Sequence, residues 1–257
     1  MTGVLPTALG DATRIVQILL KTGKEYVCLM HLHKKIPESE IKKQVERFIG
    51  KIKQLPPIKS AIKRQLRTRE IYELEIIEIK NQDVLFRIRS EAGFYVRKFC
   101  FDFGKALDTQ AHMVQLIRTK VGPFTVENWH SLYDLKDAYE YYKEGKESKL
   151  KKIIQPIEVV IQHLPKIYVF DTTVDSLCHG ASLSIPGISK LESEIKKGDA
   201  VAILTLKNEL ICLGDSLLTS EEIIEKEKGL AITSKKVFMS PNTYPKFIKA
   251  SSENKQL

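Results

Sequence analysis

Few side chains in this 257-residue sequence have a type and spacing that could perform chemistry by themselves. His31 and His33 are two residues apart on a predicted strand and so share one face, but the sequence shows no third side chain to complete a metal site. The four cysteines are widely separated and form no CxxC pair, which favours reduced and buried thiols. The sequence also contains no Ser/His/Asp set, phosphate-binding glycine loop or HExxH motif. We therefore expect no metal, nucleotide or organic cofactor.

The strongest chemical signal is a basic stretch that follows a double proline. The prolines disfavour regular structure, and the five cations behind them are Lys59, Lys63, Arg64, Arg67 and Arg69. We expect an extended, mobile loop over 59–69 whose side chains would meet phosphates. The net charge of +9 agrees, and residues 1–164 carry all of the excess, with 29 Lys and Arg against 20 Asp and Glu. An acidic substrate or a membrane surface would also explain this charge, but nucleic acid is the default partner.

Three further residues are candidates only through the segments that contain them. Tyr26 lies in the predicted strand KEYVCLMHLH, Arg97 lies where a short strand turns into a helix in GFYVRKF, and Leu116 lies in the predicted strand HMVQLIRTKVGPF. Residue type alone favours a structural role for each, because tyrosine and arginine are common on strands and leucine is a core residue. Any functional meaning has to come from the order of these segments.

The hydrophobic pattern divides the chain into two parts that would position these residues. The first part has helices at 12–22 and 39–49 and strands at 70–78 and 83–89, and Tyr72, Leu74 and Ile76 share one strand face. A polar helical segment at 131–154 is typical of a connector, and short strands and turns follow from about residue 165. We expect domains at 1–160 and 161–245 and a C-terminal tail at 246–257.

Composition indicates where such a protein would act. Hydrophobic residues make up 43% and charged residues 28%, which is typical of a soluble globular protein. No apolar run approaches the roughly 20 residues that cross a bilayer, and no signal-like segment precedes the first predicted helix. We expect a soluble, cytoplasmic protein that does not bind membranes.

Eight segments follow one another in an order and spacing that matter more than any one of them. They are TGVLPTALGDATR, KEYVCLMHLH, QLPPIKSAIKRQLRTR, GFYVRKF, RTKVGPF, HGASLSIPGI, GDAVAILTL and KKVFMSPNTYP. In this order the sequence resembles the TruB-type pseudouridine synthases, and within them the archaeal dyskerin-like catalytic subunits of box H/ACA ribonucleoproteins. The resemblance implies an α+β catalytic domain with a mixed sheet that lacks its N-terminal part, followed by a small β-barrel PUA domain.

The resemblance also implies an activity, its substrates and its partners. The family isomerises uridine to pseudouridine in RNA without a metal or organic cofactor. The implied substrates are the TΨC-loop uridine of tRNA and rRNA uridines that an H/ACA guide RNA selects with small accessory proteins. The reaction breaks the glycosidic bond, rotates the base and rejoins it through C5, with an aspartate as nucleophile.

Residue roles follow from the matching motifs. Arg97 corresponds to the arginine that pairs with the nucleophilic carboxylate. Tyr26 corresponds to the tyrosine that stacks on the target base and helps to remove the C5 proton, and Leu116 would pack against the uracil. The 59–69 loop resembles the thumb loop that closes over the substrate strand. In the PUA-like module a loop matches one that approaches RNA, with a purely structural turn as the alternative; it contains His179, Gly180 and Ala181.

The nucleophilic aspartate itself is missing. The family's glycine-leucine-aspartate-proline motif stands directly before TGVLP, which places the aspartate just before Met1. Within the chain, Asp11 is better explained as a helix-start charge and Asp102 as a surface or packing residue. Relatives usually have valine at the position of Met1, so we expect a GTG codon taken as a start, or a truncated chain. If the chain begins at Met1, we expect no isomerase activity and an uncovered sheet edge, and the alternative function is a non-catalytic RNA-binding scaffold.

Overall fold

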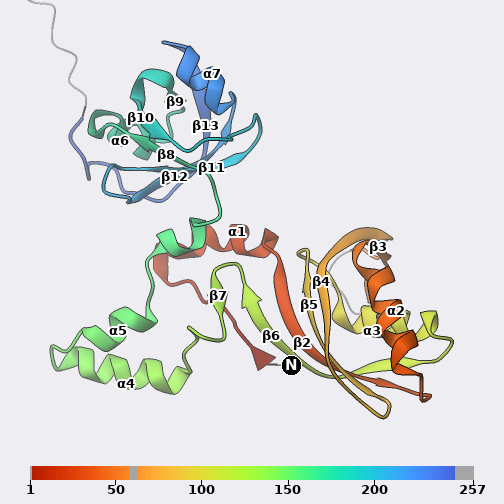
Figure 1. The fold of residues 1–257 in the computed structure, drawn as a ribbon. Helices are drawn as coiled ribbons and strands as arrows, with labels where there is room; N and C mark the ends of the chain where they lie inside the picture. Colours follow the sequence, from red (N-terminus) through yellow and green to blue (C-terminus); the bar gives the residue numbers. More distant parts are fainter. Residues whose placement is uncertain (1, 58–62, 247–257) are drawn as a thin grey trace, which may run out of the picture. The chain divides into compact units, whose positions relative to one another are not determined.

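The computed structural model describes residues 2–57 and 63–246 (Figure 1). The chain forms two compact units. The first comprises the residues up to Thr7 together with Val16–Ile154, and the second comprises Ala8–Ile15 with the residues from Gln155 onward. The segment Ala8–Ile15 therefore belongs to the second unit although it lies near the start of the chain.

The first unit is built on a seven-stranded sheet. Its strands are β1 (Thr2–Gly3), β2 (Lys24–Leu32), β3 (Gly50–Gln54), β4 (Arg67–Lys80), β5 (Asp83–Ser90), β6 (Ala111–Val121) and β7 (Phe124–Thr125). They follow the spatial order β1-β6-β2-β5-β4-β3, and β7 pairs with β6. The β1–β6 pair is parallel and the other pairs are antiparallel, so the sheet is mixed as predicted.

Two helices of the first unit, α2 (Glu38–Phe48) and α3 (Val96–Ala106), pack against this sheet. The other helices of the unit are α1 (Val16–Lys21), α4 (Leu132–Lys143) and α5 (Ser148–Ile153). Ile41 of α2 and Phe99 of α3 are buried in the same core as Cys28 and Phe86 of the strands. The Phe99 ring meets the Phe86 ring edge to face, with 5.4 Å between centroids, so α3 is held firmly against the sheet. The predicted helix over 12–22 is split into a 3-10 turn, Gly10–Ile15, and α1.

One predicted strand face is wrong at Tyr72. The register of β4 against β5 shifts between Ile71 and Glu73, so an extra residue bulges out of the ladder there. Ile71 and Leu74 remain buried, whereas Tyr72 is 41% exposed and does not share the buried face of Leu74. A simple period-two pattern assumes an unbroken ladder and therefore cannot reveal this bulge.

The second unit has its own sheet and core. Its regular elements are η1 (Gly10–Ile15), η2 (Ile157–Ile161), β8 (Lys166–Val169), α6 (Asp171–Cys178), β9 (Leu183–Ser184), η3 (Ile185–Gly187), β10 (Ile188–Leu191), β11 (Ala200–Leu204), β12 (Leu210–Ser216), α7 (Ser220–Glu225) and β13 (Leu230–Val237). The six strands follow the order β10-β8-β11-β12-β13-β9, with β8 and β11 parallel. Side chains such as Leu177, Ile203 and Ile232 form a core separate from that of the first unit. Two mixed sheets with their own helices confirm the predicted α+β class.

The cysteines contribute to these cores as free thiols. All four are buried, and Cys28 Sγ lies 3.8 Å from Cys100 Sγ between β2 and α3. The hydrogen bond with Cys28 and then burial hold the pKa of the Cys100 thiol above its ordinary value, and burial raises the pKa of Cys212 to about 12. Among the helices that the structure describes, none is long and apolar enough to span a bilayer.

Candidate active site and RNA-binding residues

Tyr26 lies near the start of β2, in the middle of the sheet. The register places it between Ile88 of β5 and Arg118 of β6, and its half-buried ring packs against the core. Burial raises the pKa of the Tyr26 phenol above its ordinary value of 10.0, although the charge and hydrogen bond of Arg118 oppose this shift. The hydroxyl is therefore protonated at neutral pH.

Arg118 fastens the TGVLP segment to the sheet. Its Nε donates a hydrogen bond of 2.7 Å to the Val4 carbonyl, and the Val4 N–H donates one of 2.8 Å to the Arg118 carbonyl. Gly3 lies opposite Arg118 with φ +116°, and a Cβ there would stand 2.2 Å from the Arg118 carbonyl oxygen. Only glycine fits this contact. Sequence reasoning missed Arg118, although it begins the motif RTKVGPF, because a strand pattern does not identify a residue's neighbours.

Arg97 lies in the first turn of α3 and is exposed. The amino-terminal end of a helix is electropositive, so a cation there is unfavourable unless an anion joins it. No ion pair links Arg97 to any carboxylate in the described ranges, whereas its neighbour Lys98 pairs with Asp102 one turn later. The guanidinium is therefore placed to receive an anion from outside α3.

The fold brings Leu116 to the same face as Tyr26. Leu116 is buried on β6 opposite Cys28, which follows Tyr26 by two residues on β2. Cys100, one turn after Arg97 on α3, contacts Cys28 through the two sulfur atoms. Tyr26 and Leu116 thus lie on adjacent strands, beneath the helix that carries Arg97 in its first turn.

Gln54 fixes the backbone just before Arg97, a role that sequence reasoning missed. Its side chain is 1% exposed at the end of β3. Oε1 accepts a hydrogen bond from the Tyr95 N–H at 3.0 Å, and Nε2 donates one to the Tyr95 carbonyl at 3.3 Å. This reciprocal pair ties β3 to the turn that leads into α3. A glutamine beside a double proline gives no signal of this contact.

The two aspartates considered as substitutes have local partners. Asp102 pairs with Lys98 on α3. Asp11 lies in the second unit, is exposed, and pairs with Arg14 at 3.3 Å. Each carboxylate therefore has an ordinary ion-pair role.

The predicted basic loop is shorter than expected. Lys59 lies outside the described residues, and Lys63 and Arg64 are exposed outside regular structure. Arg67 and Arg69 belong instead to β4, where they pair with Gln54 and Ile52 of β3, so the expectation of a loop up to residue 69 is wrong. The strand extends this far because β3 supplies a complete ladder of backbone partners.

Arg69 is engaged by its own unit. Its side chain is only 20% exposed, and one guanidinium nitrogen lies 3.5 Å from Glu91 Oε1. Gly93 has φ +78°, and a Cβ there would stand 3.2 Å from the Arg69 guanidinium. Arg69 thus packs under the turn before α3 and is less available to phosphate than Lys63 and Arg64.

The PUA-type loop after α6 is exposed, with His179 capping the helix. Its Nδ1 lies 2.8 Å from the Asp175 carbonyl. The Gly180 N–H bonds the Leu177 carbonyl and the Ala181 N–H bonds the Ser176 carbonyl, which together form a Schellman motif. Gly180 has φ +86° with open space around it, so the cap requires glycine and the surface also remains accessible. The structural turn and the RNA-facing loop are therefore compatible.

A third histidine joins the pair considered at the outset. His112 of β6 pairs with His31, and its Nδ1 lies 2.9 Å from His33 Nε2. His31 Nδ1 in turn lies 2.7 Å from Asp83 Oδ1. Within the two described ranges, no group of three or more metal-binding side chains is arranged to hold an ion. The His33 and His112 rings are hydrogen-bonded to each other, and the His31 ring packs beside both.

Comparison with known proteins assigns the chain to a family. A model of the C-terminal domain of tRNA pseudouridylate synthase B matches residues 97–162, a PUA domain model matches 165–238, and a model of the Pus10 C-terminal region matches 10–127. A probable tRNA pseudouridine synthase B of Methanothermobacter thermautotrophicus is 50% identical over 247 residues, which are 96% of this chain and 76% of the relative. The chain belongs to the tRNA pseudouridine synthase B family. A second member, from Pyrococcus abyssi, is 51% identical over 96% of this chain and 74% of its own length.

Solved structures agree with this family. A Cbf5-Nop10-Gar1 complex contains a chain that is 50% identical, with a TM-score of 0.90 over 95% of this chain and 75% of the other. A chain of an H/ACA ribonucleoprotein bound to a substrate RNA with 2'-deoxyuridine is 48% identical, with a TM-score of 0.88 over 95% and 74% of the two chains. These similarities confirm the predicted resemblance to pseudouridine synthases of the H/ACA branch and the predicted PUA domain.

Proposed function

We propose that this protein serves in the isomerisation of uridine to pseudouridine in RNA, as a catalytic subunit of the H/ACA type. Its relatives are named as probable tRNA pseudouridine synthases. Similar chains occur in a Cbf5-Nop10-Gar1 complex and in an H/ACA ribonucleoprotein bound to a substrate RNA. The observation that carries the proposal is the convergence of Tyr26 and Leu116 on one sheet face under α3, whose first turn carries Arg97. The proposed substrates are the TΨC-loop uridine of tRNA and guide-selected uridines of rRNA.

The residues suit different parts of this reaction. Leu116 offers an apolar wall for the uracil, and Tyr26 offers a flat ring with a hydroxyl group. Because the pKa of Tyr26 is raised, the resting group is a neutral phenol. It can stack on the base and hold a hydrogen bond, and it becomes a proton acceptor only if the bound substrate lowers its pKa.

Arg97 is assigned to the nucleophilic carboxylate. The family reaction needs an ionised aspartate, and a guanidinium beside it keeps the carboxyl pKa low in a dry pocket. The exposed position at the start of α3, where the helix dipole adds positive potential, supports this role. β1 and Arg118 hold the TGVLP segment that follows the expected aspartate, so they would position its backbone.

RNA binding is assigned to two surfaces. Lys63 and Arg64 are exposed cations of the thumb-like segment, and Lys59 belongs to the same stretch of sequence. On the second unit the open loop with His179, Gly180 and Ala181 would approach RNA, since glycine permits close contact with a nucleotide. We further propose H/ACA guide RNA and small accessory proteins as partners, no cofactor, and the cytoplasm as the place of action because tRNA and rRNA are the substrates.

A second candidate function is a non-catalytic RNA-binding scaffold. The observation in its favour is that Arg97 has no carboxylate partner within the part of the chain that the structure describes. Such a protein would bind guide or substrate RNA through the same surfaces and would leave uridine unchanged.

One experiment separates the two functions. The M. thermautotrophicus relative is longer than this chain, so a hybrid can carry the relative's amino-terminal segment ahead of Thr2. Release of tritium from RNA labelled at uridine C5 is measured for the 257-residue chain, the hybrid, and a hybrid whose added aspartate is changed to alanine. We expect turnover by the intact hybrid only, with RNA binding by all three proteins.

Each result has a clear meaning. Turnover by the 257-residue chain would refute the assignment of the nucleophile to the segment before TGVLP. A folded hybrid that binds RNA without turnover would favour the scaffold. Loss of turnover on changing Arg97 to glutamine in the hybrid, with RNA affinity unchanged, would support its role beside the carboxylate.

A further inference from the structure

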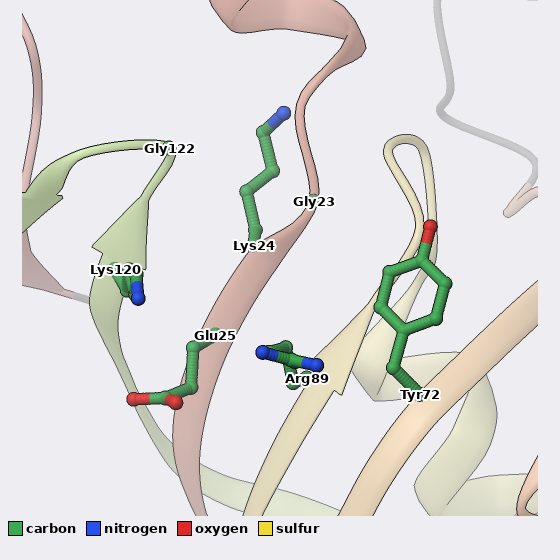
Figure 2. A pocket seen from close by; sticks show the side chains of 7 residues that line it. All are labelled: Gly23, Lys24, Glu25, Tyr72, Arg89, Lys120 and Gly122. Atoms are coloured by element: carbon green, nitrogen blue, oxygen red, sulfur yellow. The ribbon is translucent and has the colours of Figure 1, made fainter. Parts of the chain in front are cut away.

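A shallow hollow of about 300 Å³ lies at one end of the sheet of the first unit. None of the predicted catalytic or RNA-binding residues lines it. Figure 2 shows Lys120 and Glu25 on one side of Lys24, and Arg89 and Tyr72 on the other. The lining therefore combines three cations, one carboxylate and one aromatic ring.

The charged side chains of the hollow differ in how freely they could bind a ligand. Lys24 Nζ donates three hydrogen bonds, of 2.8 to 3.1 Å, to carbonyls at the end of α1, so its charge closes that helix. The carboxylate of Glu25 accepts a hydrogen bond of 2.7 Å from Thr119 Oγ1. Lys120 forms no ion pair with a residue in the described ranges and is only half-buried. Its ammonium group is therefore the cation of the hollow that is most available to a new anion.

Tyr72 supplies the aromatic wall. The β4 bulge turns it out of the core and leaves it 41% exposed. The guanidinium carbon of Arg89 lies 5.8 Å from the ring centroid, while Arg89 Nη2 is 2.9 Å from Glu73 Oε1, so Arg89 is fixed beside the ring. At Gly23 an added Cβ would stand 3.2 Å from the Tyr72 ring, and glycine therefore keeps the hollow open on that side.

We propose that this hollow binds an unpaired nucleotide of RNA, with its base against Tyr72 and its phosphate at Lys120 and Arg89. Exposed aromatic rings and basic side chains together are how proteins hold single-stranded nucleic acid. RNA fits better than an acidic protein segment because a flat base uses the Tyr72 ring as well as the two cations. The inference rests on the proposed function and extends it by a site that contains none of the residues assigned above to catalysis or RNA binding.

The test compares RNA binding by matched variants of the 257-residue chain. The probe is a fluorescein-labelled oligouridylate, measured by anisotropy over a range of salt concentrations. We expect Tyr72→Ala to weaken binding about tenfold and Tyr72→Phe to stay within about twofold of the wild type, because stacking needs the ring alone. Lys120→Gln should lower the slope of log affinity against log salt by about one, as loss of one phosphate contact does.

Controls use a tyrosine and a lysine that lie outside the hollow. Tyr133→Ala removes a tyrosine that is 82% exposed on α4, and Lys42→Gln removes a lysine paired with Glu38 on α2; both should bind RNA as the wild type does. In the unaltered protein, a thiouridine-substituted RNA should crosslink to Tyr72 under ultraviolet light. Circular dichroism of each variant identifies any that fails to fold, and the crosslink needs no variant.

Three outcomes would overturn the inference. If the folded Tyr72 and Lys120 variants keep the RNA affinity and the salt slope of the wild type, the site is refuted and the proposed function stands. The site is also refuted if a variant keeps its RNA affinity and loses only the binding of an accessory protein. Failure of the wild type to bind RNA would remove the proposed function as well. A tenfold loss confined to the Tyr72→Ala variant, with the crosslink, would establish the site.

Discussion

Gln54 and Tyr95 are 41 residues apart in the sequence, yet two hydrogen bonds join the Gln54 amide to both backbone groups of Tyr95. The contact lies at the end of β3 and immediately before α3, so it links the strand that leads into the basic segment with the turn that carries Arg97. The buried amide acts as both donor and acceptor. It therefore fixes the register between the two segments as well as the distance that separates them.

Replacing Gln54 should therefore destabilise the folded protein. Gln54→Leu removes both hydrogen bonds from a buried site and should lower the free energy of unfolding by about 2 kcal/mol. Gln54→Glu keeps one acceptor but turns a carboxylate oxygen toward the Tyr95 carbonyl, and should be worse. Urea denaturation measures both, with exposed Gln17→Leu on α1 as the control. Equal stability of the Gln54→Leu variant and the wild type would contradict this account.

The close approach of Gly3 to Arg118 gives a second prediction. Gly3→Ala places a methyl group 2.2 Å from a backbone oxygen, so β1 must separate from β6. Gly145→Ala is the matched control, because Gly145 also has positive φ, +84°, but has open space around it. The control should cost about 1 to 2 kcal/mol from backbone strain alone, and Gly3→Ala should cost more. Hydrogen exchange at the Val4 amide should also become fast in the Gly3→Ala variant only.

Replacing Arg97 with glutamine should have opposite effects on activity and on stability. In the hybrid described above, Arg97→Gln should abolish turnover. It should also leave the 257-residue chain equally stable or more stable by about 0.3 to 1 kcal/mol, because it removes a cation from the electropositive helix end. Thermal unfolding at low salt measures the second effect. Marked destabilisation would show that Arg97 has a structural role instead.

The raised pKa of Tyr26 predicts a pH-dependent stability difference. Above about pH 10 the unfolded chain loses the phenolic proton while the folded chain keeps it, so the wild type loses stability as pH rises through this range. Tyr26→Phe lacks this proton. The wild type should therefore lose stability relative to the Tyr26→Phe variant above pH 10 and keep a constant difference below it. Denaturant unfolding at a series of pH values tests this, and parallel curves throughout would contradict it.

The sequence predicted those parts of the fold that follow from local pattern. The segment KEYVCLMHLH predicted a strand that contains Tyr26, and β2 confirms it. The resemblance assigned Leu116 and Arg97 to the same site, and this assignment stays a prediction. The features that the local pattern could not predict depend on partner strands far along the chain. The bulge that exposes Tyr72 exists only in the ladder of β4 with β5, and β4 begins at Arg67 because β3 is there to pair with it.

The same reason explains the contacts that sequence analysis missed. Arg118 contacts Val4, Gln54 contacts Tyr95, and His112 contacts His33, in each case across tens of residues. Their types are ordinary for a strand, and nothing near them in the sequence indicates the second partner. Such contacts become visible only once the strand order is known.

The parallel pairing of β1 with β6 has a consequence for how the protein is made. The hydrogen bond from Arg118 to Val4 spans 114 positions of the chain. During synthesis the first residues therefore leave the ribosome long before their partner strand exists, and they remain unpaired until β6 has joined β2. Closing so long a loop is entropically expensive, so the TGVLP segment docks late, after the antiparallel strands are in place. The positioning of the backbone of the proposed active site would then be among the last events of folding in this unit.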